Sequence, residues 1–182
     1  MPQKIPGTMA QQDGEKGQRV GGKFLTFFLA GEEYGIEILK VHEIIGMMPI
    51  TRVPRTPPFI RGVLNLRGKV IPIIDLRLKF GMEAREQTDE TCIIVVQVQG
   101  VETGIIVDKV SEVLDITDEE IEETPNFGIE VNTDYILGIG KTEDRVKILL
   151  DIDKVLSTGE VVELHSARTK GEEQAEEATP VG

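Results

Sequence analysis

The sequence predicts a mostly β protein made of two packed copies of a five-stranded unit, each of which closes into a small barrel. Short runs rich in Val, Ile and Phe are bounded by Gly, Pro and Asp, a pattern typical of strands. The runs form two series with the same order of elements, which indicates an internal duplication. Strands this short leave no exposed edge when the unit closes on itself, so a barrel is favoured over an open sheet.

Helix is expected only as short turns. One turn should follow Thr117, because Thr117 and Glu120 have the spacing of a capping box. Another should follow Ile152 and carry Val155 and Leu156. The strands are expected over residues 24–29, 34–36, 41–47, 62–66, 70–74, 92–98, 102–107, 113–116, 137–141 and 146–150.

The duplication is visible in residues that strand propensity alone does not explain. Apolar matches between strands mean little, because strands of any origin share Val and Ile. The matched Gly, Lys, Glu and Asp positions are what make chance a poor explanation. The copies pair 33–45 with 102–114 and 24–29 with 93–98 at an offset of 69, and 60–63 with 136–139 and 70–76 with 146–152 at an offset of 76.

These patterns divide the chain into a folded body and two tails. Residues 1–22 contain many Gly and little periodicity, so a flexible N-terminal tail is expected there. The body covers 23–156, with approximate repeats over 23–88 and 89–156. Whether strands are exchanged between the two barrels is left open. Residues 157–182 are predicted to be a polar, acidic tail, with a short helix at its start left open.

Composition excludes several classes of protein. The net charge of −12 disfavours nucleic acid, since neutralising phosphates requires a cationic face. No apolar run approaches the ~20 residues that cross a bilayer, and nothing resembles a signal peptide. Cys92 stands alone, which excludes an internal disulfide framework and fits a reducing cytoplasm.

No set of residues indicates catalysis, a cofactor or a metal. His42 and His165 have neither a nucleophile nor a second ligand at a useful spacing, and Cys92 lies in an apolar strand. Residues 138–142 end like a phosphate-binding loop, but Tyr135 stands where that loop needs Gly and a strand follows in place of a helix. We therefore expect no enzyme.

One segment carries a family resemblance. Residues 59–76 place Arg67 at a hairpin tip between two apolar strands. Together with 33–41 and 137–140, this segment closely resembles the CheW coupling proteins of bacterial chemotaxis. The resemblance extends over roughly 23–156.

The resemblance implies both a fold and a function. The implied fold is two packed barrels of the SH3-like type, in agreement with the duplication. The implied function is a chemotaxis adaptor that couples the cytoplasmic tip of methyl-accepting receptors to the histidine kinase CheA and helps to assemble receptor–kinase arrays. The regulatory domain of CheA is the expected kinase contact. The protein would be cytoplasmic and recruited to arrays at the inner face of the membrane, without inserting into it.

Site residues also follow from the resemblance. A helical receptor tip is expected to lay apolar residues into a groove between the barrels. The receptor-binding residues are expected to be Val41, Glu43, Val113 and Arg67. The characteristic structural or interface hairpin comprises Gly62, Asn65, Arg67 and Gly68.

Two other classes of function stay open. One is a small β-barrel that binds a ligand or nucleic acid and is unrelated to chemotaxis, which the negative charge and the absence of Trp disfavour. The other is an enzyme of unfamiliar type, which the missing nucleophile–base and metal sets disfavour.

Overall fold

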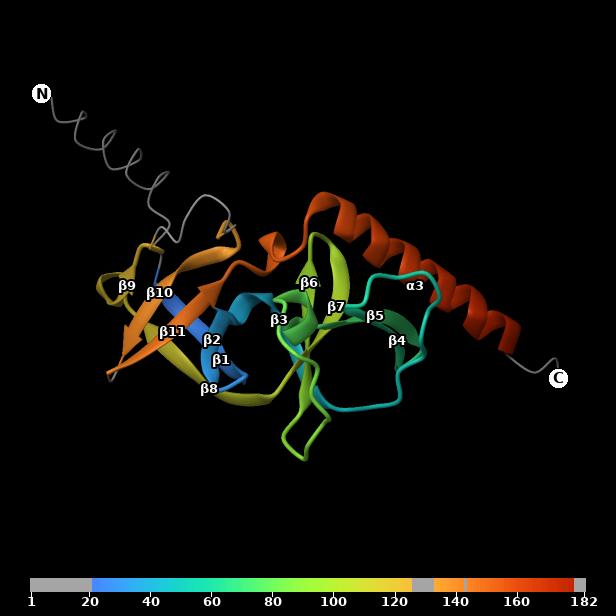
Figure 1. The fold of residues 1–182 in the computed structure, drawn as a ribbon, viewed down its shortest axis with the longest axis horizontal. Coiled ribbons are helices and arrows are strands. Elements are labelled where there is room, and N and C mark those ends of the chain that lie inside the picture. The colour runs from blue at the N-terminus through green and yellow to red at the C-terminus, as the bar shows by residue number, and fades with distance from the viewer. Residues whose placement is uncertain (1–20, 126–132, 143, 179–182) are drawn as a thin grey trace, which may run out of the picture.

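The computed structural model describes residues 21–125, 133–142 and 144–178 (Figure 1). The tail expected over 1–22 lies outside this part of the chain, except for its last two residues. The elements in chain order are β1 (Gly22–Leu29), β2 (Glu32–Glu37), η1 (Ile38–Lys40), β3 (Val41–Gly46), β4 (Ile60–Leu66), β5 (Lys69–Asp75), α2 (Leu76–Lys79), β6 (Cys92–Val98), β7 (Val101–Val107), β8 (Lys109–Ile116), η2 (Asp118–Glu120), β9 (Ile121–Glu122), β10 (Ile136–Thr142), β11 (Arg145–Leu150), η3 (Ile152–Lys154) and α3 (Thr158–Ala178).

The strands form two sheets that lie side by side (Figure 1). Sheet 1 has the order β8-β1-β2-β11-β10-β9, and sheet 2 has the order β3-β6-β7-β5-β4. The first two strands of each repeat therefore join the last strands of the other repeat. Each sheet contains one parallel pair, β2 with β11 and β5 with β7, and both of these pairs join strands of different repeats. The chain thus exchanges its strands between the two units.

The predicted fold class is confirmed, with two differences in detail. Sheet 2 has the expected five strands, whereas the short β9 gives sheet 1 a sixth. Neither sheet closes into a complete hydrogen-bonded ring among the described residues. The two edge strands of sheet 1, β8 and β9, are consecutive in the chain and are joined by η2. The chain therefore runs from one edge of the sheet to the other, although β8 and β9 are not hydrogen-bonded neighbours.

The two expected helical turns are confirmed. Thr117 and Glu120 form the capping box around η2, with the Glu120 carboxylate accepting a hydrogen bond from the Thr117 N–H at 2.9 Å. η3 begins at Ile152 and leads into Val155 and Leu156, all three of which are buried. Both turns sit where a strand leaves its sheet, so they fix the direction of the chain there.

A bulged glycine recurs in both repeats. β4 shifts its register against β5 between Ile60 and Gly62, and β10 shifts against β11 between Ile136 and Gly138. Gly62 has a φ of +144°, and a Cβ on it would lie 2.1 Å from the carbonyl oxygen of Thr51. Thr51 exchanges two hydrogen bonds of 2.8 Å with the backbone of the residue after Gly62. The missing side chain lets this neighbouring segment pack against the strand.

Three apolar clusters hold the molecule together. The largest lies between the sheets and extends beneath α3, and each sheet also has a cluster of its own. The cluster of sheet 1 is the smallest, and polar side chains complete the interior there. Glu33 and Lys147 are both buried, with 3.6 Å between carboxylate and ammonium, and Lys147 donates to the Thr142 hydroxyl at 2.7 Å.

The chain crosses between the sheets at two points, and an ion pair anchors each crossing. After β2, Lys40 of η1 contacts Asp153 of η3 at 2.7 Å. After β7, Asp108 accepts two hydrogen bonds from Arg77 of α2, at 2.8 and 2.7 Å. Each crossing is therefore held to a short helix, η3 after β11 in the first case and α2 after β5 in the second.

The segment 157–182, expected to be a polar tail with a short helix at its start left open, contains the much longer helix α3. This helix spans Thr158–Ala178 and packs on β4 and β5 (Figure 1). Val161, Leu164 and Ala167 recur every third residue and are buried in the cluster between the sheets. So few apolar positions within a charged sequence give only a weak amphipathic pattern, which is why the sequence resembled a solvated tail.

Replacing Gly62 with Ala should lower the free energy of unfolding by about 3 kcal/mol, because a Cβ collides with backbone and the φ is unfavourable. Gly68→Ala, at a φ of +87° with open space around it, should cost about 1 kcal/mol. Urea unfolding of both variants checks this, with Gly46→Ala as the control in open space. Equal effects at Gly62 and Gly68 would contradict the packing of residue 51.

Replacing Leu164 with Ala should cost about 3 kcal/mol, because the side chain is fully buried. Val162→Ala is the control on the exposed side of the same helix and should change stability by less than about 0.5 kcal/mol. Thermal unfolding measures both. A neutral Leu164→Ala variant would mean that α3 does not pack on the body.

Acid should weaken the crossing after β7. Burial raises the pKa of Asp108, but hydrogen bonds from Arg77 and from the Ala30 N–H outweigh it, so the pKa lies below its ordinary value. The lowered pKa of Asp108 adds to the free energy of unfolding. This contribution is fully present above the unfolded pKa of about 3.9 and is lost as the pH falls through the folded pKa. Asp108→Asn should therefore be less stable than the parent at pH 7, with a gap that narrows towards pH 3. Asp115→Asn, in an exposed pair, should show almost no gap at either pH.

Candidate functional site

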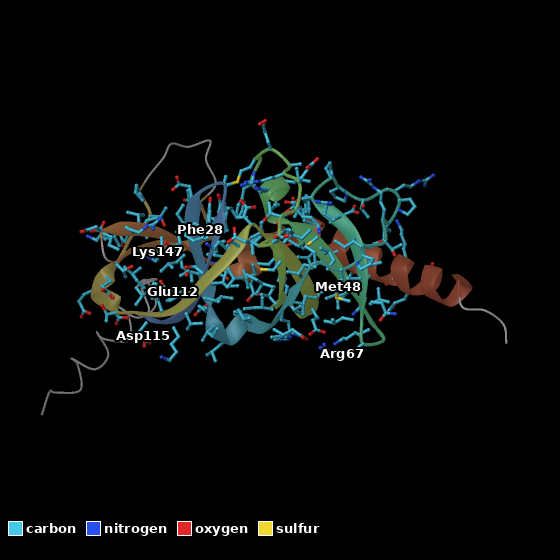
Figure 2. The ribbon with its side chains drawn as sticks, turned by 90° about the horizontal axis from the view of Figure 1, so that it is seen from below. Phe28, Met48, Arg67, Glu112, Asp115 and Lys147 are labelled. Carbon is cyan, nitrogen blue, oxygen red and sulfur yellow. The ribbon has the colours of Figure 1, made fainter. Side chains whose placement is uncertain are left out.

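The predicted hairpin joins β4 and β5 and is confirmed. Arg67 and Gly68 form its tip with φ values of +54° and +87°, the combination that a two-residue hairpin turn requires. The side-chain oxygen of Asn65 accepts a hydrogen bond of 2.7 Å from the Gly68 N–H. The tip is thereby held in one conformation, with the Arg67 side chain projecting at an outer edge of the molecule (Figure 2).

Gly62 belongs to the same hairpin but is buried at its base. Because Gly62 has no side chain, the backbone of Thr51 can pack directly against it. The hairpin therefore has a structural base and an exposed tip, and only the tip is available to a partner.

An ion pair connects the hairpin tip to β3. Arg67 donates a hydrogen bond to the Glu43 carboxylate, which raises the pKa of the guanidinium. The arginine side chain is 69% exposed and the glutamate 31%. The structure thus brings together two of the four residues expected at the receptor contact.

A second charged group lies at the same end of sheet 2. Glu102 of β7 contacts Lys69 at 2.6 Å and the His42 Nδ1 at 3.0 Å. Hydrogen bonds from Lys69 and then from His42 lower the pKa of Glu102. Glu102 also attracts Arg67 electrostatically. The charged strip therefore comprises the Arg67–Glu43 pair together with Glu102 and its partners Lys69 and His42.

Apolar side chains flank this strip on β3 and just beyond it. Val41 is half-buried and packs against the cluster between the sheets. Ile44 is 45% exposed and Met48 is 37% exposed. Large apolar side chains exposed beside paired charges are the usual composition of a protein contact.

Val113 lies on the other sheet, in β8 opposite Leu25 of β1, and is 49% exposed. The structure therefore does not place Val113 on the strand that carries Val41 and Glu43. Ile44 is the counterpart of Val113 in the other repeat and is equally exposed. The repeat itself was the signal that could have identified Ile44 from the sequence.

Leu39 is a further residue that the sequence did not indicate. It is 92% exposed in η1 and lines a cavity of about 710 Å³ beside His42 and Gly100. No sequence signal marks it, because an apolar residue ahead of a strand resembles ordinary core. Its exposure appears only once the crossing after β2 is built.

Two features of the described residues concern metal binding and nucleophilic chemistry. These residues contain no group of three or more His, Cys, Asp or Glu side chains placed to hold a metal ion. Burial raises the pKa of the Cys92 thiol, which makes it a poor nucleophile at neutral pH.

None of the helices in the described part of the chain has the length and apolar character needed to cross a membrane.

Comparison with known proteins gives the same family throughout. The model of the CheW-like domain matches residues 23–160. The chain is 47% identical to the chemotaxis protein CheW of Klebsiella aerogenes over 145 residues, which is 80% of this chain and 87% of that protein. It is 40% identical to CheW of Bacillus subtilis over 139 residues, covering 76% and 88% of the two chains.

A solved structure agrees. The crystal structure of the scaffolding protein TtCheW from Thermoanaerobacter tengcongensis superposes with a TM-score of 0.71 at 38% sequence identity. The match covers 78% of this chain and 96% of that one. A ligand- or nucleic-acid-binding barrel unrelated to chemotaxis finds no support in these matches. The chain belongs to the CheW-like domain family, whose matched members are chemotaxis proteins.

Proposed function

We propose that this chain is a chemotaxis adaptor that couples methyl-accepting receptors to the histidine kinase CheA and helps to assemble receptor–kinase arrays. The observation that carries the proposal is that the family match covers the entire two-sheet body. Within that body, the most distinctive surface is an exposed hairpin tip with a paired arginine. A protein of this kind acts by holding partners together and needs no catalytic group.

The receptor contact is proposed on β3 and the hairpin tip. Glu43 and Arg67 supply a charged rim, and Val41 and Ile44 supply apolar area beside it. Small interfaces of this composition depend on a few apolar anchors surrounded by charges. A helical receptor tip would lay its apolar face along β3 and meet Arg67 at one end. Val113 then belongs to a contact of its own on sheet 1.

The kinase contact is proposed to use the regulatory domain of CheA. Leu39 is well suited to it, because a side chain 92% exposed beside a cavity offers a single apolar anchor. This surface lies at the crossing after β2 and adjoins the start of β3, whereas the hairpin tip of the receptor contact lies on β4 and β5. Simultaneous binding of both partners, side by side on this part of the body, is part of the proposal.

The proposed partners also set the location. Receptor tips project into the cytoplasm, so the adaptor would be cytoplasmic and concentrated at arrays on the inner face of the membrane. Its attachment would be through protein contacts, without insertion into the bilayer.

Arg67→Ala should weaken receptor binding about five-fold, because the charged rim loses the side chain that pairs with Glu43. Val41→Met should also weaken it, because the longer side chain changes the apolar surface of β3. Pull-down with receptor cytoplasmic fragments, together with receptor-controlled CheA activity, measures both effects.

Lys141→Ala is the matched control, because Lys141 also pairs with a carboxylate on the surface but lies on sheet 1. All three variants should keep the parent circular dichroism spectrum. Unchanged receptor binding and kinase control in Arg67→Ala and Val41→Met would refute the proposed contact.

A further inference from the structure

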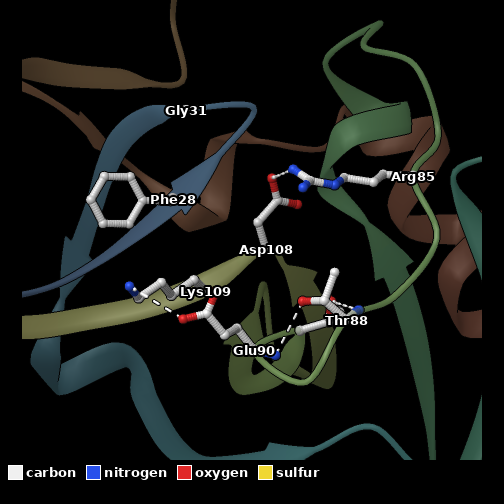
Figure 3. A pocket seen from close by; sticks show the side chains of 8 residues that line it. Phe28, Gly31, Arg85, Thr88, Glu90, Asp108 and Lys109 are labelled. Carbon is white, nitrogen blue, oxygen red and sulfur yellow. Dashed lines mark hydrogen bonds and ion pairs between the residues drawn. The ribbon is translucent and has the colours of Figure 1, made fainter.

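A second pocket lies where the chain crosses between the sheets after β7 (Figure 3). Its volume is about 360 Å³, and it is bounded by the end of β1, the start of β8 and the segment that leads into β6. It lies on different strands from the proposed receptor contact. The residues that line it are Phe28, Gly31, Arg85, Thr88, Glu90, Thr91, Asp108 and Lys109.

The internal repeat provides a comparison for this pocket. Its counterpart is the cavity at the crossing after β2, which Leu39 lines. The two pockets share a glycine and a lysine but differ in their other side chains. By the offset of the repeat, Phe28 corresponds to Gln97, Gly31 to Gly100, Asp108 to Leu39 and Lys109 to Lys40.

Asp108 does not make the pocket acidic, because the Arg77 guanidinium pairs with its carboxylate. Its oxygens accept two hydrogen bonds from Arg77 and a third, of 2.8 Å, from the Ala30 N–H. The charge of Arg77 compensates that of Asp108. Any further cation in the pocket therefore adds net positive charge.

Two further cations are present, and both are held loosely. Arg85 approaches Asp108 only to 3.8 Å, and its side chain is 57% exposed. Lys109 lies 3.3 Å from Glu90, and both side chains are more than half exposed. Exposed pairs of this kind contribute about 0–1 kcal/mol, so a ligand carboxylate can replace Glu90 at little cost.

The remaining walls supply an apolar surface and a fixed turn. The Phe28 ring lies directly across from Lys109 in the register of β1 and β8, as Figure 3 shows. Hydrogen bonds of 2.8 Å from the Thr88 N–H to the Thr91 hydroxyl, and of 3.1 Å from the Glu90 N–H to the Thr88 hydroxyl, hold the opposite wall. The Arg145 guanidinium lies over the Phe28 ring, 5.9 Å from the ring centroid. An aromatic side chain surrounded by cations suits a ligand with an aromatic ring and an anionic group.

We propose that this pocket binds an aromatic carboxylate, with the ring on Phe28 and the carboxylate between Arg85 and Lys109. The ligand could be a small aromatic acid or the C-terminal aromatic residue of a peptide, since both carry the same chemistry. Binding would add contacts between sheet 1 and the segment leading into β6, so it should also stabilise the folded chain.

The test is a titration of the full chain followed by amide chemical shifts. The probes are 3-phenylpropanoate for a small acid and N-acetylphenylalanine for a peptide end, each with its neutral carboxamide. We expect saturable shifts at Phe28, Lys109 and Thr91 with at least one acid, and much weaker binding of the amides. Binding of only one acid identifies the source of the ligand.

Variants separate this site from unspecific binding. Lys109→Gln and Arg85→Gln should each weaken the acid about five-fold, the equivalent of roughly 1 kcal/mol. Phe28→Leu should weaken acid and amide alike, and Lys141→Gln on the distant end of sheet 1 should change nothing. The proposal is overturned if neither acid gives saturable shifts, if the amides bind as tightly, or if the charge variants bind like the parent.

Discussion

The fold depends on the exchange of strands between its two repeats. β1 and β2 lie in sheet 1 and continue into β3 in sheet 2, whereas β6 and β7 lie in sheet 2 and continue into β8 in sheet 1. Neither sheet can form from one repeat alone, because each needs its central pair from the other. The two crossings are thus the points on which both sheets depend, and each is tied down by an ion pair, Lys40 with Asp153 and Asp108 with Arg77.

The crossings also generate the surfaces to which we assign function. The chain leaves the crossing after β2 at Lys40 and enters β3, where Val41 and Glu43 meet the hairpin tip of Arg67. The same crossing exposes Leu39. The crossing after β7 builds the pocket of Phe28 and the loosely held cations. A duplicated architecture therefore yields two related positions, and differences between the repeats give them different chemistry.

Much of this arrangement could be predicted from the sequence. Strand runs, the hairpin at Arg67 and Gly68, and the capping box at Thr117 are local features, and a local pattern determines them. The duplication is also visible in the sequence because its matches include Gly, Lys and Glu. Which strands pair across repeats is decided by long-range packing between the sheets, so the exchange could only be left open.

The failures have the same origin. α3 has too few apolar residues to be distinguished from a solvated tail, and its stability comes from Val161 and Leu164 packing on a surface that exists only after sheet 2 forms. Val113 lies on sheet 1 and Val41 on sheet 2, so a shared role at the groove between the barrels stays a prediction. Ile44 and Leu39 were missed because exposure of an apolar side chain is a property of the assembled fold.

Reconstitution can show whether this body holds a receptor and a kinase domain at the same time, as we propose. Receptor cytoplasmic fragments tethered to vesicles would be sedimented with the CheA regulatory domain, in the presence and absence of this chain. We expect the regulatory domain to sediment with the vesicles only when the chain is present, and in proportion to the amount of chain added. Sedimentation that does not depend on the chain, or competition between receptor and regulatory domain for it, would contradict the claim.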